Sequence, residues 1–485
     1  MIDLHRNEEV LEKSVQRARE RNILLPTLHQ MAHPEEVPEK IKEKLKHTDL
    51  WAVDPVNLFR ITWKNEPREQ GGGYGNVNYL EFPPELTGVP AKIIALTGKW
   101  FPTGCHKVGA SFGCLAPRLV TGQFDPSFHR AVWPSTGNFC RGGAYNSALL
   151  GCRAVAILPE DMSRERFEWL HSIAGEVIKT PGGESNVKQI FDTAAEMKRT
   201  QPDVMVFNQF EELGNHLWHY SVTGPALEEA VKDCGGRLAG CCFTSGSGGT
   251  LGAGDYLKEA FPGSRLAVGE ALQCPTLLEN GYGEHQIEGI GDRHVPWIHN
   301  VKNTDMVMAI DDRDCMALLR LFHEEAGREY LVREAGVPKE LVDKLGLLGI
   351  SGIANLLCAI KFARYYELTS KDVVATVLTD SAAMYQSRLE EMASRQGDYT
   401  LVRAVACHAG VLLGQKTDAL LELSYYEKKR IHNLKYYTWI EQQGRCVEEL
   451  NQQWYDAEEY WGGVHQQKEE IDRCIREFNT AVGLV

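Results

Sequence analysis

Short apolar runs alternate with amphipathic stretches along the middle of this chain. Eight runs rich in Val, Ile, Leu, Ala and Cys are typical of buried strands. They lie at residues 91–96, 130–133, 154–158, 176–179, 204–207, 238–243, 265–268 and 372–378. Helical patterns follow several of them, as at 110–120 and 143–150. Strands that alternate with helices form largely parallel sheets, with sites at the carboxyl ends of the strands, so the pattern predicts an α/β fold.

The two ends of the chain carry a different pattern. Residues 1 to about 48 read as charged helices broken by prolines, and glycines at 71–73 mark a loop. From about residue 415, polar helices carry many tyrosines and tryptophans. The predicted organisation is a helical N-terminal extension over 1–80, a core over 81–400 with a smaller subdomain at roughly 118–225, and a helical C-terminal extension over 401–485.

Composition narrows the classes of function. The formal net charge of −14 over 485 residues argues against nucleic acid as the main partner. Acidic residues interleaved with the C-terminal aromatics also disfavour a base-stacking platform, and favour an element that packs on the core or on a second subunit. The 13 cysteines have no CxxC spacing, which indicates reduced thiols in a cytoplasm. Without a signal peptide or a membrane-length apolar run, we expect a soluble, cytoplasmic protein with no membrane partner.

Lys107 is the first residue that suggests chemistry. It lies in the segment Thr103-Gly-Cys-His-Lys-Val-Gly-Ala110, where small residues leave room for a flat ligand. An amine in such a place forms a Schiff base with an aldehyde once burial or a nearby charge lowers its pKa. His106 could relay protons, but an extended segment would direct it away from Lys107, so a structural or phosphate-facing role is favoured. Cys105 is interpreted as a packing residue rather than a reactive thiol.

Two glycine-containing loops after predicted strands suit anions. The loop at 134–143, Pro-Ser-Thr-Gly-Asn-Phe-Cys-Arg-Gly-Gly, can offer backbone N–H groups to a carboxylate, or it can simply start a helix capped by Ser135 or Thr136. The loop at 243–251, Phe-Thr-Ser-Gly-Ser-Gly-Gly-Thr-Leu, can wrap an oxyanion, and Ser247 and Thr250 add hydroxyl donors. No lysine follows its glycines, so it is not the P-loop of nucleotide hydrolases, and it best suits a single phosphate.

A third polar segment ends the last predicted strand. In Val377-Leu-Thr-Asp-Ser-Ala-Ala-Met-Tyr385, Ser381 could hydrogen-bond a ring nitrogen or cap a helix. An aldehyde-binding lysine, a phosphate cup, Asn138 for a phenolic oxygen and Ser381 for a ring nitrogen together describe a pyridoxal-phosphate site. His216 and His219 are three apart, as metal ligands on a helix can be, but no third ligand is in view, so we predict no metal site.

The chain resembles the fold-type II pyridoxal-phosphate enzymes over roughly residues 80–390, in particular the cysteine synthase and cystathionine β-synthase group. The segments that carry the resemblance are Ser-Thr-Gly-Asn at 135–138, Asn-Gln-Phe-Glu-Glu-Leu-Gly-Asn at 208–215, Gln-Ile-Glu-Gly-Ile-Gly at 286–291, Gly-Ile-Ser-Gly at 349–352 and Asp-Ser-Ala-Ala-Met-Tyr at 380–385. It implies two open, twisted, largely parallel sheet subdomains with pyridoxal 5'-phosphate in the cleft between them, as in tryptophan synthase β, plus the helical C-terminal extension.

The resemblance also implies roles for individual residues. Lys107 would be the catalytic residue and the cofactor's Schiff-base partner. The other cofactor-binding residues would be Asn138, Gly246, Ser247, Gly248, Gly249, Thr250 and Ser381. The substrate would be bound by Ser135, Thr136, Gly137, Phe139 and Gln209. A neutral serine at position 381 leaves the pyridine unprotonated, which in the family accompanies chemistry at the β-carbon through an aminoacrylate intermediate.

The lysine segment departs from the closest group. Cysteine synthases have Ser-Val-Lys-Asp-Arg there, whereas this chain has Cys-His-Lys-Val-Gly. A His-Lys pair is similar to tryptophan synthase β chains, yet Asn138-Phe139 replaces the glutamine-histidine pair of their carboxylate loop. We therefore predict a lyase that performs α,β-elimination on a cysteine- or serine-like β-substituted L-amino acid. The alternatives are a β-replacement synthase, the pyridoxal-phosphate subunit of a two-component enzyme, or a catalytically silent assembly subunit; a homodimer, with a possible accessory subunit, is expected.

Overall fold

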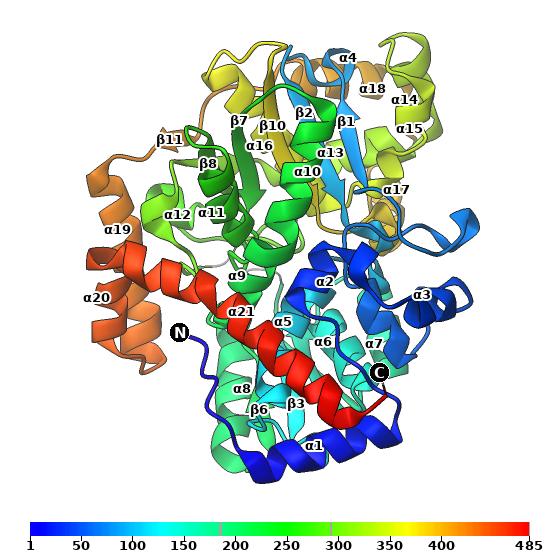
Figure 1. The fold of residues 1–485 in the computed structure, drawn as a ribbon. Coiled ribbons are helices and arrows are strands. Elements are labelled where there is room, and N and C mark those ends of the chain that lie inside the picture. Colours follow the sequence, from blue (N-terminus) through cyan, green and yellow to red (C-terminus); the bar gives the residue numbers. More distant parts are fainter. Residues whose placement is uncertain (184–186, 292, 485) are drawn as a thin grey trace.

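The computed structural model describes residues 1–183, 187–291 and 293–484. They form an α/β fold with two sheets, as predicted. Figure 1 shows the larger sheet in the upper half of the molecule and the smaller sheet in the lower half, with α5 and α9 between them. Among the described residues, no helix has the length and apolar composition needed to cross a membrane.

The larger sheet has seven strands in the order β1-β2-β10-β7-β8-β9-β11. The five inner strands are parallel, and the edge strands β1 and β11 pair antiparallel. The strand bounds are β1 Tyr79–Phe82, β2 Lys92–Thr97, β7 Arg237–Thr244, β8 Arg265–Ala271, β9 Met306–Ile310, β10 Asp372–Leu378 and β11 Leu420–Glu422. The apolar patterns predicted β2, β7, β8 and β10 but missed β1, β9 and β11.

The smaller sheet has four parallel strands in the order β5-β4-β3-β6. Its strands are β3 Arg130–Pro134, β4 Arg153–Pro159, β5 Glu176–Thr180 and β6 Val204–Val206. All four were predicted, and they fall inside the range 118–225. The exact boundaries of the subdomain and of the two extensions stay predictions.

Helices cover both faces of each sheet. The core helices are α4 Pro84–Thr87, α5 Lys107–Val120, α6 Asn138–Leu149, α7 Arg164–Ile173, α8 Val187–Thr200, α9 Leu213–Trp218, α10 Gly224–Cys234, α11 Leu251–Ala260, α12 Thr276–Glu279, α13 Asp312–His323, α14 Glu325–Arg333, α15 Lys339–Val342, α16 Ile350–Tyr365 and α17 Gln386–Gln396. Helix α16 is buried along almost its whole length because it packs against β7 and β10 of the larger sheet.

Close packing of α5 and α6 brings two parts of the future site together. A Cβ atom on Gly142 of α6 would lie 2.8 Å from the Cα of Val108 and 2.9 Å from the backbone oxygen of Lys107, so only glycine allows this approach. Asn146 fixes the pair by donating from Nδ2 to the Val108 backbone oxygen at 2.8 Å. The first turns of the two helices are therefore neighbours.

The extensions wrap the core and meet each other. The N-terminal helices are α1 Glu8–Glu20, α2 Leu28–Ala32 and α3 Glu39–Lys46, and the C-terminal helices are α18 Leu401–Cys407, α19 Tyr425–Lys435, α20 Val447–Tyr455 and α21 Ala457–Val482. In Figure 1, α21 runs diagonally across the front, beside α2 and α1. Asp472 of α21 accepts hydrogen bonds from the backbone N–H groups of Leu28 and His29, so it caps α2 from the other end of the chain.

Candidate active site

Lys107 is the first residue of α5, so the helix begins three residues before the predicted start. Its Nζ donates to Ser247 Oγ at 2.9 Å and to Gln209 Oε1 at 3.3 Å. Both partners are almost fully buried, whereas Lys107 keeps partial exposure. The structure therefore brings together a predicted catalytic amine, a predicted phosphate-binding hydroxyl and a predicted substrate-binding amide.

Asn215 holds both partners of Lys107 in place. From α9, its Nδ2 donates to Ser247 Oγ at 3.1 Å and to the backbone oxygen of Gln209 at 3.0 Å. Asn215 lies at the end of the Asn-Gln-Phe-Glu-Glu-Leu-Gly-Asn segment, but no role was predicted for it. Its side chain is completely buried, so this amide is a fixed part of the site.

The loop at 246–250 has the form of an anion cup. Among the residues that the structure describes, no acceptor takes a hydrogen bond from any of these five backbone N–H groups. The loop leads directly into the N-terminus of α11, whose dipole favours negative charge. Gly248 has a φ of +75°, and a Cβ atom on Gly249 would lie 2.1 Å from Asn215 Oδ1. Five free donors at a helix N-terminus fit a phosphate group.

The predicted carboxylate loop lies next to Gln209. Ser135 Oγ accepts from Gln209 Nε2 at 3.3 Å and from the Gly137 backbone N–H at 3.2 Å. Helix α6 begins at Asn138 with Gly137 at its N-cap position and no capping side chain, which differs from a cap by Ser135 or Thr136. Phe139 points elsewhere, because its ring packs against Trp133 with centroids 5.5 Å apart. Its predicted contact with substrate could therefore involve only its backbone.

Asn138 and Ser381 meet charged residues at the end of β10. Asn138 Nδ2 donates to Asp380 Oδ2 at 2.7 Å, and Tyr385 donates to the same oxygen at 2.7 Å. Burial raises the pKa of Asp380, whose Oδ1 has no partner among the described residues. Ser381 caps no helix; its Oγ accepts from Lys99 Nζ at 3.3 Å. Burial lowers the pKa of Lys99.

Comparison with known proteins identifies what this donor set holds. The model of a family described as pyridoxal-phosphate dependent enzyme matches residues 102–332. A cysteine synthase of Staphylococcus aureus is 30% identical over 289 residues, which cover 59% of this chain and 84% of that protein. This chain belongs to the pyridoxal-phosphate dependent enzymes.

Other relatives place it in the predicted group. A probable cysteine synthase of Bacillus subtilis is 28% identical and covers 59% of this chain and 85% of that protein. A cystathionine beta-synthase of Saccharomyces cerevisiae is 25% identical and covers 63% of this chain and 59% of that protein. The solved structure of an O-acetylserine dependent cystathionine beta-synthase from Helicobacter pylori superimposes with a TM-score of 0.54, at 25% identity, over 64% of this chain and 94% of that chain. The predicted family, fold and cofactor are confirmed.

The residues present fit pyridoxal phosphate. The five free N–H groups at 246–250 suit its phosphate, and the Lys107 amine beside them suits its aldehyde. Asn138 and Ser381, both nearly fully buried, supply an amide and a hydroxyl for the polar atoms of its ring. The roles of the individual residues stay predictions.

Two buried arginines near the pyridoxal-phosphate site were not predicted. Arg166 of α7 bonds Glu288 through Nη1 and Tyr385 through Nη2, the latter at 3.0 Å. Glu288 also accepts from Arg388 Nε at 2.6 Å. This network joins α7, beside the smaller sheet, to the end of β10. The second arginine, Arg141 of α6, lies beside Asn138. Neither has a sequence signal, because arginine usually lies on the surface.

His106 and Cys105 face away from pyridoxal-phosphate chemistry. The His106 ring packs against His219 and Trp63, with centroids 5.0 and 5.6 Å away, and neither nitrogen has a partner among the described residues. Burial and the charge of Lys107 lower its pKa to about 3. Burial raises the pKa of Cys105 to about 12, so it stays a thiol. These positions favour the structural role for His106 and the packing role for Cys105.

His216 and His219 do not converge. His219 bonds Thr223 Oγ1 at 2.9 Å, whereas His216 meets His465 and Asp255 in a buried cluster of potential metal ligands. The His216 and His465 Nε2 atoms are 3.0 Å apart, with parallel rings whose centroids are 5.3 Å apart. This separation means that the two nitrogens point at each other, as in a hydrogen bond. The cluster fastens α21 to α9. It also supplies potential third and fourth ligands that the sequence did not reveal, so the absence of a metal site stays a prediction.

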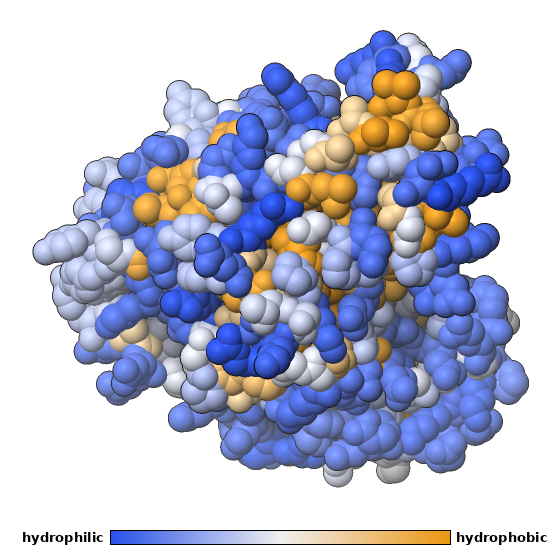
Figure 2. Space-filling model, turned by 90° about the horizontal axis from the view of Figure 1, so that it is seen from above, coloured by the Kyte–Doolittle hydropathy of each residue, from blue (hydrophilic) through white to orange (hydrophobic). Residues whose placement is uncertain are grey.

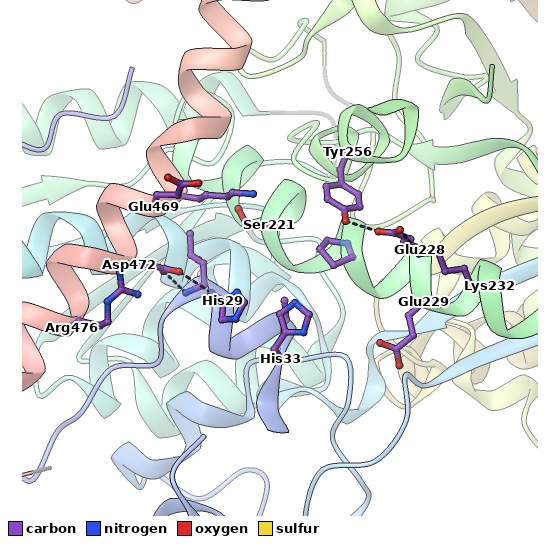
Figure 3. A pocket seen from close by; sticks show the side chains of 14 residues that line it. His29, His33, Ser221, Glu228, Glu229, Lys232, Tyr256, Glu469, Asp472 and Arg476 are labelled. Atoms are coloured by element: carbon purple, nitrogen blue, oxygen red, sulfur yellow. Dashed lines mark hydrogen bonds and ion pairs between the residues drawn. The ribbon is translucent and has the colours of Figure 1, made fainter. Parts of the chain in front are cut away.

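A surface cavity of about 810 Å³ lies between α2, α10 and α21, away from Lys107. Figure 3 shows that its wall mixes both signs of charge, with Glu228 and Glu229 facing His29, His33 and Arg476 across the opening. Asp472, which caps α2, also lines it. The cavity lies where the two extensions meet α10 of the core, and none of the predicted site residues lines it.

Proposed function

We propose that this enzyme removes the β-substituent of a cysteine- or serine-like L-amino acid by α,β-elimination. The observation that carries the proposal is the position of Lys107 Nζ, held by Ser247 and Gln209 between an anion cup and a carboxylate loop. The relatives support the same class, because cysteine synthases and cystathionine beta-synthases are among them.

Pyridoxal phosphate, when bound, supplies an electron sink that stabilises negative charge on the α-carbon of an amino acid. The residues at 246–250 hold its phosphate with their backbone N–H groups. Ser135, Thr136, Gly137 and Gln209 bind the α-carboxylate of the substrate. Lys107 Nζ then takes the α-proton, because Ser247 and Gln209 restrict where the free amine can lie. Asn215 keeps both of these partners in register.

The polar groups at the ring support chemistry at the β-carbon. Ser381 presents a neutral hydroxyl to the ring nitrogen, and its neighbour Lys99 is a donor rather than an acceptor. No carboxylate contacts Ser381 Oγ among the described residues. When pyridoxal phosphate is bound, these two donors would leave its ring nitrogen unprotonated, and that state would favour expulsion of the β-substituent.

Replacement of the β-substituent by a nucleophile is the second candidate, and the cysteine synthases among the relatives favour it. Elimination is preferred because the Cys-His-Lys-Val-Gly segment departs from theirs and His106 lies outside the site. Assays with O-acetyl-L-serine, β-chloro-L-alanine and L-cysteine separate the two. Elimination releases pyruvate and ammonia without a second substrate, whereas replacement requires added sulfide or thiol. Turnover restricted to amino acids that lack a β-leaving group would contradict both.

The role of Lys107 is tested by the visible absorbance of the purified protein. Lys107→Ala should lose the band of the cofactor bound to lysine and at least 1,000-fold in turnover, because no other amine lies at this position. Lys99→Met is the matched control, since Lys99 is also half-buried near the ring. If the band persists in Lys107→Ala and disappears in Lys99→Met, the cofactor is bound by Lys99 and the proposed role of Lys107 is wrong.

We further propose a cytoplasmic homodimer. Leu401, Val402 and Val405 of α18 are 52%, 77% and 42% exposed. Helix α18 lies at the top of Figure 1, and Figure 2, which views the molecule from above, shows apolar patches on this face. A second copy would cover them. The free thiols of all 13 cysteines suit a reducing compartment. Analytical ultracentrifugation should give a dimer that Val402→Glu shifts to monomer, and a monomeric wild type would contradict the proposal.

A further inference from the structure

Arg141 is a buried cation beside the predicted cofactor ring. It lies one turn after Asn138 on the same face of α6, and only 1% of it is exposed. Its Nη1 reaches Asn138 Oδ1 at the long distance of 3.5 Å. The guanidinium carbon lies 4.9 Å from the ring centre of Trp169 and 5.6 Å from that of Trp51. Among the described residues, the guanidinium thus contacts two aromatic rings and makes one long hydrogen bond to an amide.

The other fully buried arginines have shorter hydrogen bonds or ion pairs than Arg141. Arg60 donates to three backbone oxygens, Arg166 bonds Glu288, and Arg320 bonds Glu324 at 2.7 Å. Arg141 has no ion pair with any described carboxylate, unlike Arg166 and Arg320, and its Nε has no acceptor among the described residues, as is also true of the Nε of Arg60 and Arg166. Burial lowers its pKa to about 10, which still leaves it charged at neutral pH. A buried charge without a counter-ion is costly, and proteins keep such groups mainly where a ligand completes them.

Asp380, the carboxylate whose charge acts on Arg141, is occupied by other partners, including Arg166 at 4.0 Å. Asp380 accepts from Asn138 and Tyr385, and the Asn138 amide stands between it and Arg141. Cation–π contact with two tryptophans attracts the guanidinium, but it does not neutralise the charge. Arg141 therefore lacks an anionic partner among the described residues.

The site around Arg141 is continuous with the lysine loop. Trp51, from the N-terminal extension, packs over Gly104, where a Cβ atom would lie 3.0 Å from its ring. Gly104 is three residues before Lys107. The backbone around Trp51 is fixed, because Asn57 and Tyr145 both bond the Ala52 oxygen, at 2.9 and 2.6 Å. Trp51 therefore forms one wall that reaches from Lys107's loop to Arg141.

We propose that Arg141 binds a second anionic group on the substrate, a sulfonate, phosphate or carboxylate carried at its β-carbon. The proposal rests on the function proposed above and names the substrate class for the same site. The α-carboxylate is left to Ser135, Gly137 and Gln209, on the other side of Asn138. The planar guanidinium matches the oxygen geometry of all three anions. Trp169 and Trp51, the latter 37% exposed, cover two faces of the guanidinium, which is itself buried, and burial strengthens a charge interaction there.

Binding of two nearly isosteric amino acids to the cofactor-loaded enzyme tests this without any turnover. L-Aspartate carries a side-chain anion, L-asparagine does not, and neither has a good β-leaving group. Calorimetry should show that the wild type binds L-aspartate about 10- to 100-fold more tightly than L-asparagine, the range expected for a charge-assisted pair. Arg141→Met should lose this preference and keep its affinity for L-asparagine within about threefold. Arg141→Lys should retain part of it, because the charge remains but the planar fork is lost.

Three results would overturn the proposal. Equal affinity of the wild type for the two amino acids would show that Arg141 meets no side-chain anion. An equal loss for both in Arg141→Met would assign the residue to the α-carboxylate. Weaker retention of pyridoxal phosphate in Arg141→Met, with the amino-acid preference intact, would assign it to the cofactor. If Arg141→Met does not fold, the wild type and Arg141→Lys still decide.

A kinetic comparison separates this proposal from the proposed function. O-Phospho-L-serine and L-cysteate should react at least tenfold more efficiently, in kcat/KM, than O-acetyl-L-serine, and Arg141→Met should reverse the order. If none of these reacts, the proposed elimination fails while the aspartate preference still tests Arg141. If only neutral substrates react, the result supports the proposed elimination and contradicts the proposed role of Arg141.

Discussion

The two sides of Lys107 are built from different kinds of group. On one side, the residues 245–250 and Asn215, here called the cup side, offer backbone N–H groups and neutral side chains. On the other, Asn138, Arg141, Arg166 and Asp380, here called the ring side, place three ionisable groups in the protein interior. The backbone N–H groups of the cup side have no acceptor among the described residues and suit one anion. The ring side has charges that are only partly compensated.

The difference shows how the site divides its work. A phosphate is the same in every substrate complex, so fixed dipoles at a helix N-terminus can bind it without a buried charge. A substrate side chain varies, and a charged residue that the fold leaves unpaired can discriminate between ligands at a cost in stability. We therefore expect changes on the cup side to reduce cofactor binding, and changes on the ring side to alter selectivity while stability is kept or improved.

The largest expected effect is on the cup side. In Gly249→Ala, the new Cβ atom would lie 2.1 Å from Asn215 Oδ1, and Asn215 cannot move without releasing both Ser247 and Gln209. Affinity for pyridoxal phosphate should fall at least 100-fold, which corresponds to about 3 kcal/mol. Titration of the apoprotein with the cofactor, followed by visible absorbance, measures this change.

Gly462→Ala is the control for that substitution, because nothing lies within 4 Å of its Cβ position in α21. It should leave cofactor affinity unchanged and stabilise the helix slightly. Normal cofactor binding by Gly249→Ala would mean that the loop does not hold the phosphate. The cup side would then not be the phosphate-binding side of the site.

On the ring side, Asp380→Asn should not destabilise the protein. Burial raises the Asp380 pKa, so the folded protein holds this proton more tightly than the unfolded chain, and the residue's contribution to stability falls as pH rises from about 4 towards the folded-state pKa. An asparagine keeps the acceptor for Asn138 and Tyr385 and removes the charge. Arg166, whose Nη2 lies 4.0 Å from Asp380 Oδ2, keeps its ion pair with Glu288. We expect the free energy of unfolding at pH 8 to rise by about 2 kcal/mol, measured by urea denaturation.

Asp192→Asn, at an exposed carboxylate on α8, should change stability by less than about 0.5 kcal/mol and serves as the control. A loss of about 3 kcal/mol or more in Asp380→Asn would show that Asp380 is the counter-ion required by the two arginines. Arg141 would then have a counter-ion within the protein, and the ring side would contain no uncompensated charge.

A smaller effect is expected where the cup meets the amine. Ser247→Ala removes one acceptor of Lys107 Nζ and a partner of Asn215, but it leaves the backbone N–H groups in place. kcat/KM should fall about tenfold while the cofactor's absorbance is retained, since one hydrogen bond to a charged group contributes about 1.5 kcal/mol or more. Ser172→Ala, on the exposed end of α7, should have no effect. Loss of the cofactor in Ser247→Ala would show that the hydroxyl matters more than the backbone.

The cup side could be predicted from the sequence because its chemistry needs particular residues at adjacent positions. Gly248 must adopt a positive φ, Gly249 must admit Asn215, and the strand before them has an unbroken apolar pattern. The same reasoning predicted eight strands. It missed β9, although Met306–Ile310 is a buried apolar run flanked by turn-forming residues at 303–305 and 311–312. It also missed β1 and β11, which are short edge strands fixed by pairing.

The ring side could not be predicted, because its contacts join positions far apart in the chain. Asp380 meets Asn138 across 242 residues, and Arg166 meets Glu288 across 122. Trp51 reaches the site from an extension whose sequence indicated only charged helices. Arg141 stood inside a segment that was already assigned to the substrate, yet nothing in a single sequence tells a buried arginine from an exposed one.

The smallest expected effect concerns His106, which we expect to be uncharged in the folded protein next to the cup side. The folded-state pKa of His106 is about 3, whereas the unfolded chain titrates near 6.5, so stability is lost as pH falls through 6.5 because only the unfolded state takes up the proton. Between pH 8 and pH 6, the wild type should lose about 1 kcal/mol more than His106→Leu, whereas exposed His5→Leu should follow the wild type. Parallel curves for wild type and His106→Leu would show that folding does not shift the pKa of His106. Because the charge of Lys107 is the second cause of the low pKa, the difference should shrink when both variants are made in the Lys107→Ala background.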